Sequence, residues 1–157
     1  MKAIGNSKTT KIVIDIFMTI FLILSFVRWE AGNFAFHAIV GTGCTLFFVL
    51  HVCIHSKWLR ATTKSFSEGT LNRALKGKYI VDVLLLVVWA IAIGTGFLAI
   101  GYFSAGIESM AIFSALHGIT SRIGLALVVI HIVQHWPQIK SYLGVKQTQK
   151  SGSGQTH

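Results

Sequence analysis

The chain has little charge and almost no proline. Asp, Glu, Lys and Arg make up only 12% of its 157 residues, whereas 53% of the residues are hydrophobic. A soluble domain has roughly a quarter of its residues charged, so this composition argues against a soluble protein. A single proline leaves long helices uninterrupted and argues against a fold built from many turns.

Cysteine is also scarce, and the missing motifs exclude several kinds of chemistry. The two cysteines, Cys44 and Cys53, lie nine residues apart on one expected helix, too far apart to bridge each other. Neither belongs to a Cys-x-x-Cys-His motif, which excludes covalent c-type haem attachment. No nucleotide-binding motif is present, and we interpret the Gly94-Thr95-Gly96 run as a close helix contact. Flavin or nicotinamide chemistry would therefore have to come from another polypeptide.

Long apolar stretches dominate what remains. Each approaches the ~20 residues that a helix needs to cross ~30 Å of hydrocarbon, and none alternates strictly as a barrel strand does. We therefore predict an all-α integral membrane four-helix bundle as one domain over residues 1–143, followed by a flexible tail at 144–157. The four stretches cover residues 12–29, 34–54, 79–103 and 110–136.

The fourteen lysines and arginines are unevenly placed in a chain whose formal net charge is +9. Twelve of them lie before the first stretch, between the second and third, or after the fourth. Because positively charged connections stay on the cytoplasmic side, we expect a multi-pass protein of the inner (cytoplasmic) membrane with both termini in the cytoplasm. Topology and contact with anionic membrane lipid then explain the charge, and no nucleic-acid partner is expected.

Six of the seven histidines form an internal repeat. In the second and in the fourth stretch, three histidines follow one another at spacings of 14 and then 4 residues. A spacing of 14 residues falls about 40° short of four helical turns, so the two side chains share one face, ~21 Å apart along the axis. Two such helices running in the same direction present one histidine pair near each membrane face. The repeated histidines are His37, His51 and His55, then His117, His131 and His135.

Paired histidines on facing helices suit an iron porphyrin that is gripped from both sides. Small residues between the pairs, such as Gly41 and Gly124, leave room for a flat macrocycle. Ordinary close packing of membrane helices would also explain small residues. Matched histidines within lipid favour the cofactor, since ionisable residues there are costly and usually functional.

The two His-x13-His pairs resemble the haem-bearing helices of respiratory cytochrome b, where two helices of a four-helix bundle each give one ligand to each of two haems. The chain's size and the ending His131-x3-His135-Trp136 resemble the small flavinylation-associated cytochromes. The resemblance covers roughly residues 11–143. It implies two b-type haems, with His37 and His117 as axial ligands of the outer iron. His51 and His131 would be the ligands of the inner iron.

The remaining polar residues have open roles. His55 and His135 are expected to bond haem propionates, move protons or line a quinone pocket, or simply to contact interfacial water. Asp15 and Asp82 each follow a lysine by four residues, and we interpret them mainly as charges that complement a helix dipole, with proton uptake as the alternative. Arg122 lies ~140° away from the histidine face, and could serve a propionate, the outer surface or a subunit contact.

These features predict an electron-transfer subunit of an oxidoreductase system rather than a stand-alone enzyme. We expect it to pass electrons across the bilayer between a quinone or another inner donor and an extracytoplasmic redox partner, a flavin or haem protein. The surface from Ser104 to Glu108 is the expected outer contact, and the inner edge near His55, His135 and Asp82 is the expected quinone site. The alternative is a proton or transition-metal transporter or channel that uses the histidines as a relay.

Overall fold

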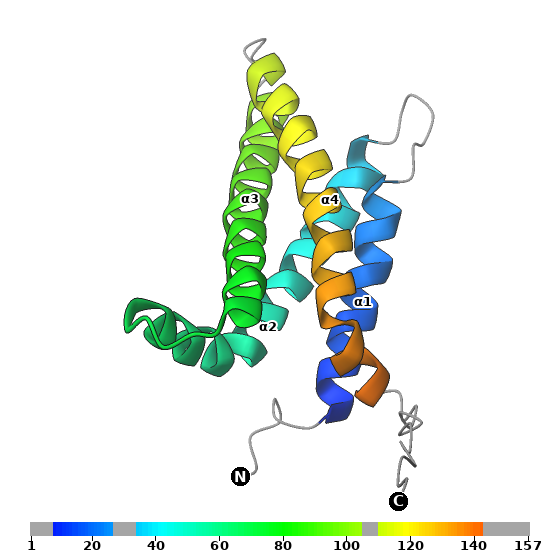
Figure 1. The fold of residues 1–157 in the computed structure, drawn as a ribbon. Helices are drawn as coiled ribbons and strands as arrows, with labels where there is room; N and C mark the ends of the chain where they lie inside the picture. The colour runs from blue at the N-terminus through cyan, green and yellow to red at the C-terminus, as the bar shows by residue number, and fades with distance from the viewer. Residues whose placement is uncertain (1–7, 27–33, 105–109, 143–157) are drawn as a thin grey trace, which may run out of the picture.

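A computed structural model describes residues 8–26, 34–104 and 110–142, and it is all-helical over these residues (Figure 1). The described residues form four helices, which confirms the predicted all-helical fold, and each helix is long and apolar enough to cross a membrane. The helices are α1 (Lys8–Phe26), α2 (Phe34–Ser67), α3 (Arg73–Ser104) and α4 (Met110–Tyr142).

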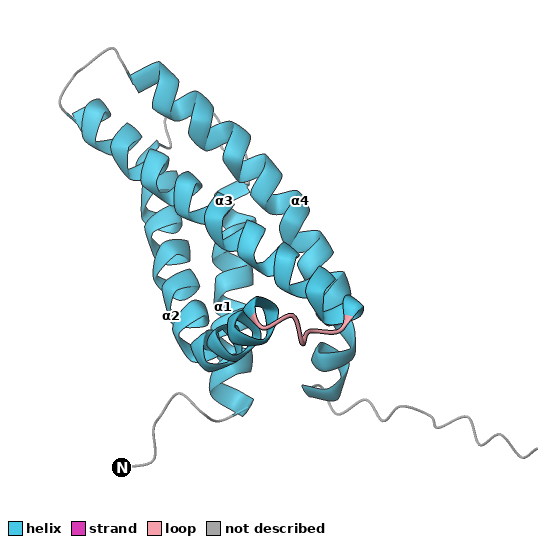
Figure 2. Cartoon of the chain, turned by 60° about the vertical axis from the view of Figure 1, so that its left-hand side comes forward, coloured by secondary structure: helices cyan, strands magenta, loops and turns pink. Residues whose placement is uncertain are grey.

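The helices pair into two hairpins. α1 packs along α2 and α3 packs along α4, whereas α2 and α3 touch much less (Figures 1 and 2). α1 begins and α4 ends at the same end of the bundle as the connection from α2 to α3 (Figure 1). We call this end the inner end and the opposite one the outer end. The arrangement agrees with the expectation that the two termini and the basic connection share one side.

Few side chains are buried, and those that are buried are of small or medium size. Within α1–α2, the Phe17 and Phe47 rings stack with centroids 5.3 Å apart, and the Phe21 ring lies directly against Gly43. Among the described residues no large side chain is fully buried. Protein interiors are normally close-packed, so the scarcity of buried side chains means that the two hairpins leave room between them. The buried hydrophobic residues are Leu22, Val40, Cys44, Ala92 and Ala99.

α2 extends well beyond the apolar stretch that predicted it. It has 34 residues, or about 51 Å of helical rise, and its last part turns across the inner end of the bundle (Figure 1). Most of the expected basic connection is therefore helical. Hydropathy marks only the part of a helix that suits lipid, whereas lysine and arginine continue a helix readily in water.

The short connection from α2 to α3 has well-defined caps. Gly69, with φ of 73°, adopts the left-handed conformation that glycine tolerates best. The amides of Gly69 and Thr70 donate to the carbonyls of Phe66 and Ser65, which is the Schellman pattern that ends a helix. The Asn72 side chain then caps α3 by accepting a hydrogen bond of 2.9 Å from the Leu75 amide.

Candidate functional site

The outer histidines of the two hairpins meet across the bundle. The rings of His37 and His117 lie with centroids 5.9 Å apart and planes at 78°. For metal–nitrogen bonds of about 2 Å, two imidazoles on opposite sides of one ion have ring centres roughly 6 Å apart. The separation of this predicted pair is therefore the one that shared axial coordination needs.

Each outer histidine is also held by the backbone of the first helix in its own hairpin. His117 Nδ1 donates a hydrogen bond of 2.8 Å to the carbonyl oxygen of Ala92 in α3. Gly96 makes this approach possible, because a Cβ atom there would come within 3.0 Å of the His117 ring. His37 makes the corresponding hydrogen bond to the backbone of Ser25 in α1. The close helix contact expected at Gly94–Gly96 is thus the place where the His117 ring packs against α3.

The inner histidines are held by carboxylates instead. His51 Nδ1 lies 2.7 Å from Asp15 Oδ1, and His131 Nδ1 lies 2.6 Å from Asp82 Oδ1. A ring that donates its Nδ1–H to a carboxylate keeps the lone pair of Nε2 available as a ligand. Histidines that bind metals are commonly oriented in this way. The inner pair therefore presents Nε2 in both hairpins.

The dipole interpretation of the two aspartates is wrong. Neither α1 nor α3 has an acidic residue in its first turn, because both helices begin well before the aspartate. The sequence does contain the signal, since Asp15 recurs as Asp82 just as the histidines recur. Ten positions separate Asp15 from Ser25, and ten separate Asp82 from Ala92. The repeat therefore includes the anchors of the histidines as well as the histidines themselves.

His55 and His135 extend the inner layer by one turn. Their rings lie 4.7 Å from that of His51 and 4.5 Å from that of His131, respectively. His135 Nε2 also lies 3.4 Å from Asp82 Oδ2, so this nitrogen faces the carboxylate. Two groups of three side chains result, each able to hold a metal ion, with ligand atoms within 4.8 Å of one another. The groups are Asp15, His51 and His55, and Asp82, His131 and His135.

The rings of His51 and His131 make no contact with each other in the part of the chain that is described. His55 lies between the hairpins, within electrostatic range of His131 and of Lys11. The structure thus joins the outer predicted pair directly and keeps the inner pair apart, each ring held on its own aspartate.

Between the two layers the glycines differ in their surroundings. Nothing lies within 4 Å of the position that a Cβ would take at Gly41, which therefore borders open space. At Gly124 a Cβ would lie 3.3 Å from Trp89 Nε1, so this glycine admits the indole of α3. Trp89 also faces Phe48 of α2 with ring centroids 6.1 Å apart. These two aromatic side chains thus lie between the histidine layers.

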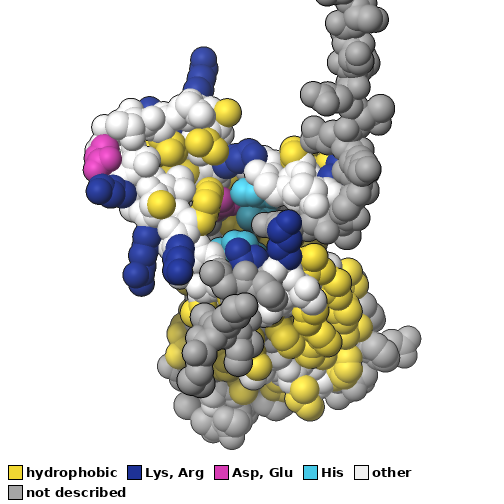
Figure 3. Space-filling model, turned by 90° about the horizontal axis from the view of Figure 1, so that it is seen from below, with side chains coloured by type: hydrophobic (Ala, Val, Ile, Leu, Met, Phe, Trp, Pro, Cys, Tyr) yellow, Lys and Arg dark blue, Asp and Glu magenta, His cyan; other side chains and the backbone are white. Residues whose placement is uncertain are grey.

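The inner end is open to the surroundings. Seen from this end, histidine and acidic side chains lie in a hollow whose edge carries lysine and arginine (Figure 3). Trp58 of α2 covers one side, with its ring centroid 6.2 Å from that of His135. Lys140 stacks over Trp136 at 5.7 Å from the ring centre, a pairing typical of the membrane interface.

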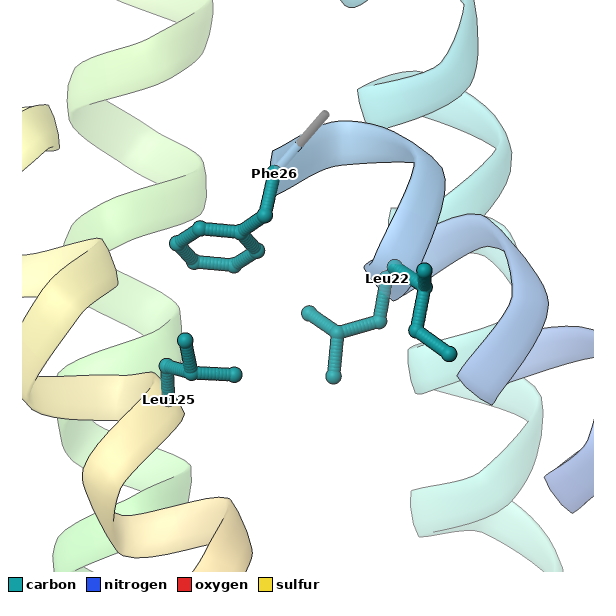
Figure 4. A pocket seen from close by; sticks show the side chains of 4 residues that line it. Leu22, Phe26 and Leu125 are labelled. Atoms are coloured by element: carbon teal, nitrogen blue, oxygen red, sulfur yellow. The ribbon is translucent and has the colours of Figure 1, made fainter. Parts of the chain in front are cut away.

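A second opening separates α1 from α4 nearer the outer end. It has a volume of about 360 Å³ and is lined only by apolar side chains, three from α1 and one from α4 (Figure 4). It contains no group that could coordinate a metal, and lipid chains are a sufficient occupant. The lining residues are Leu22, Ile23, Phe26 and Leu125.

No protein-family model, curated protein or solved structure matches the chain. The assignment of function therefore rests on the geometry of the histidines and on their repeat. The expected outer docking surface, from Ser104 to Glu108, lies almost wholly outside the described residues.

Proposed function

We propose that the chain is a membrane-bound dihaem b-type cytochrome that transfers electrons across the bilayer. The observation that supports this most is the duplicated set of anchored histidines. Each hairpin offers one imidazole at the outer level and one at the inner level, and each of the four rings is tied to the first helix of its hairpin. His37 and His117 would hold the outer haem, and His51 and His131 the inner one.

The outer layer favours a porphyrin over a bare ion. Its protein donors are two imidazoles, and no carboxylate or thiolate completes a tetrahedral set among the described residues nearby. A bare zinc or copper ion needs further ligands, whereas a porphyrin supplies four nitrogens and leaves two axial places for histidine. The space beside Gly41 and the sparsely packed interior fit a flat, bulky group.

At the inner layer the same argument selects His51 and His131 over His55 and His135. The first two give Nδ1 to aspartate and keep Nε2 free. His135 Nε2 is buried without a hydrogen bond and lies 3.4 Å from Asp82 Oδ2, so it faces the carboxylate and not the space between the hairpins. We therefore assign His55 and His135 to the edge of the site, where they are candidates for a propionate or a quinone headgroup.

The residues of the chain then have distinct tasks. A haem iron between two imidazoles gains or loses one electron without binding a further ligand. Asp15 and Asp82 fix the tautomer and orientation of the inner rings and increase their basicity. Backbone carbonyl groups do the same at the outer layer without adding charge. Since the layers lie near opposite ends of the bundle, the chain is suited to connect a donor at one face with an acceptor at the other.

The deciding experiment is a spectrum of the purified protein, oxidised and dithionite-reduced, with a pyridine haemochrome count. We expect two non-covalent, low-spin b-type haems per chain. Protein from haem-replete cells that lacks a b-type reduced α band would exclude the proposal. Reporter fusions after Lys64 and near Gly106 test the proposed inner-membrane topology, with the first expected in the cytoplasm and the second outside.

A quinone site at the inner end is the more specific part of the proposal. His135, Asp82 and Trp58 combine proton-exchanging groups with a flat aromatic surface in one hollow. Oxidised protein in liposomes, mixed with a reduced menaquinol analogue, should become reduced, and His135→Ala should slow this reduction. If a soluble inner donor reduces the protein but quinol never does, the quinone site is excluded while the cytochrome remains.

One observation favours a second function, transition-metal transport. Each inner group of one aspartate and two histidines could hold a metal ion by itself. Zinc- or copper-dependent flux into liposomes by haem-free protein, lost in His135→Ala, would favour transport. A haem-replete protein without such flux would exclude it.

A further inference from the structure

Arg122 carries a full positive charge at mid-depth on the outside of the bundle. It lies on α4 in the apolar segment between Met110 and Trp136, about 18 Å of helical rise from the first and about 21 Å from the second. Half the thickness of the hydrocarbon is only about 15 Å. The Arg122 side chain therefore leaves the helix close to the middle of the membrane, and its guanidinium does not lose its proton in proteins.

The side chain is exposed and has no hydrogen bond or ion pair with any described residue. It is rotated ~140° from His117 and so leaves α4 on the side away from the histidine layers. The same face carries exposed Ile119, Val129 and Val133, as a lipid-facing or helix-facing surface would. α4 lies at the front of the bundle in Figure 1, with no other helix over it.

None of the three acidic residues that the structure describes pairs with Arg122. Asp15 and Asp82 are bound to histidines, and Glu68 lies 3.8 Å from Lys64 at the far end of α2. Glu30 and Glu108 lie outside the described residues, in sequence between the helices. A second copy of the chain would meet Arg122 with another Arg122 and bring no free carboxylate. Within the described part of the chain, Arg122 thus lacks a negative partner, which a carboxylate of a different molecule can supply.

The surroundings of Arg122 suit close approach by another helix. Gly118 and Ala126 lie one turn before and one turn after it, and Ala126 is exposed. Nothing lies within 4 Å of the position of a Cβ at Gly118. Small residues on one helical face allow backbones to approach closely in membranes, where polar side chains then bond between helices.

We propose that this face of α4 docks a transmembrane helix of a partner protein that presents an aspartate or glutamate to Arg122 near the middle of the bilayer. The proposal does not depend on the haem assignment. The repeat supplies a contrast, because Thr42 occupies the equivalent position in α2. Its hydroxyl donates a hydrogen bond of 2.7 Å to the Ala38 carbonyl oxygen. The first hairpin therefore has no need of a partner at this place.

The test uses full-length protein in liposomes with synthetic polyleucine transmembrane helices that carry lysine at both ends. One peptide has a single glutamate at its centre and the matched peptide has glutamine. Energy transfer from the labelled peptide to a fluorescent protein fused at the C-terminus of the chain measures the association of peptide and chain. The wild-type chain should bind the glutamate peptide about tenfold more tightly, a ratio that corresponds to ~1.4 kcal/mol. Arg122→Lys should keep this preference and Arg122→Thr should lose it.

Three outcomes overturn the proposal. Equal binding of the two peptides, or no binding of either, would mean that lipid phosphate satisfies Arg122. A preference that survives in Arg122→Thr would place the contact elsewhere. Self-association of the wild-type chain that Arg122→Thr abolishes would assign the face to a second copy. Arg60→Gln, on the inner part of α2, is the control for a change of net charge, and the circular dichroism and thermal unfolding of each variant check that the bundle is intact.

Discussion

The two hairpins carry the same histidine pattern but differ in how tightly the histidine side chains are fixed. Asp82 contacts both His131 and His135 and its side chain is 11% exposed, whereas Asp15 contacts His51 and is 43% exposed. α3 and α4 also pack together more extensively than α1 and α2. A carboxylate that is shielded from water and shared by two rings fixes them more tightly than an exposed one. The second hairpin is therefore the better organised half of the site.

The outer layer shows the same difference. The anchor of His117 is the carbonyl of Ala92, which is almost completely buried at 1% exposure, and the ring rests on Gly96. His37 is more exposed and is anchored at Ser25, close to the end of α1. Helix ends fray more readily than helix centres, so we expect His37 to be the more mobile ligand.

Removal of a proposed ligand should have the largest effect, and it should be equal in the two hairpins. His37→Ala or His117→Ala should cost the outer haem, and His51→Ala or His131→Ala the inner one, because one imidazole alone cannot complete a low-spin centre. His55→Ala and His135→Ala should retain both haems. Pyridine haemochrome counts measure this directly. Loss of a haem in His135→Ala, together with retention in His131→Ala, would move the inner site by one turn.

The aspartates should reveal the inequality between the hairpins. Removing the carboxylate behind a ligating histidine typically weakens metal binding about 10–100-fold. We expect Asp82→Asn to weaken haem binding near the upper limit of this range and Asp15→Asn near the lower limit, since Asp82 is shielded from water and contacts two histidine rings. Transfer of haem to apomyoglobin measures the rate of loss. Equal rates in the two variants would show that burial of the carboxylate does not matter here.

The glycines of the middle segment should give the smallest effects, and effects of different kinds. Gly124→Ala should destabilise the fold by about 1–3 kcal/mol, because its methyl group meets Trp89 at 3.3 Å. At Gly41 nothing lies within 4 Å of the new Cβ, so Gly41→Ala should raise thermal stability slightly through helix propensity while it speeds the loss of haem. Gly77→Ala, at an open position near the inner end of α3, is the control. Haem retention in Gly41→Ala as strong as in the control would argue against a macrocycle at that face.

Hydropathy predicted the number of helices, and the 14-residue spacing predicted that His37 and His117 lie close together, because both signals depend on local sequence. The length of α2 could not be read in this way, since most of its residues from Lys57 to Ser67 are polar and hydropathy marks only the part that suits lipid. The bonds from Asp15 and Asp82 to histidine depend on how two helices rotate against each other. The repeat of the aspartates was visible, but spacing within one helix does not specify contacts between helices.

The common direction of the hairpins has a geometric consequence. Two units that cross a membrane in the same sense are related by rotation about the membrane normal, and such a rotation leaves depth unchanged. Each side chain of one unit therefore lies at the same depth as its counterpart in the other. A unit related by inversion would instead bring an outer residue opposite an inner one. Duplication of a hairpin with two histidine levels thus creates two paired levels at once, without any further adjustment of register.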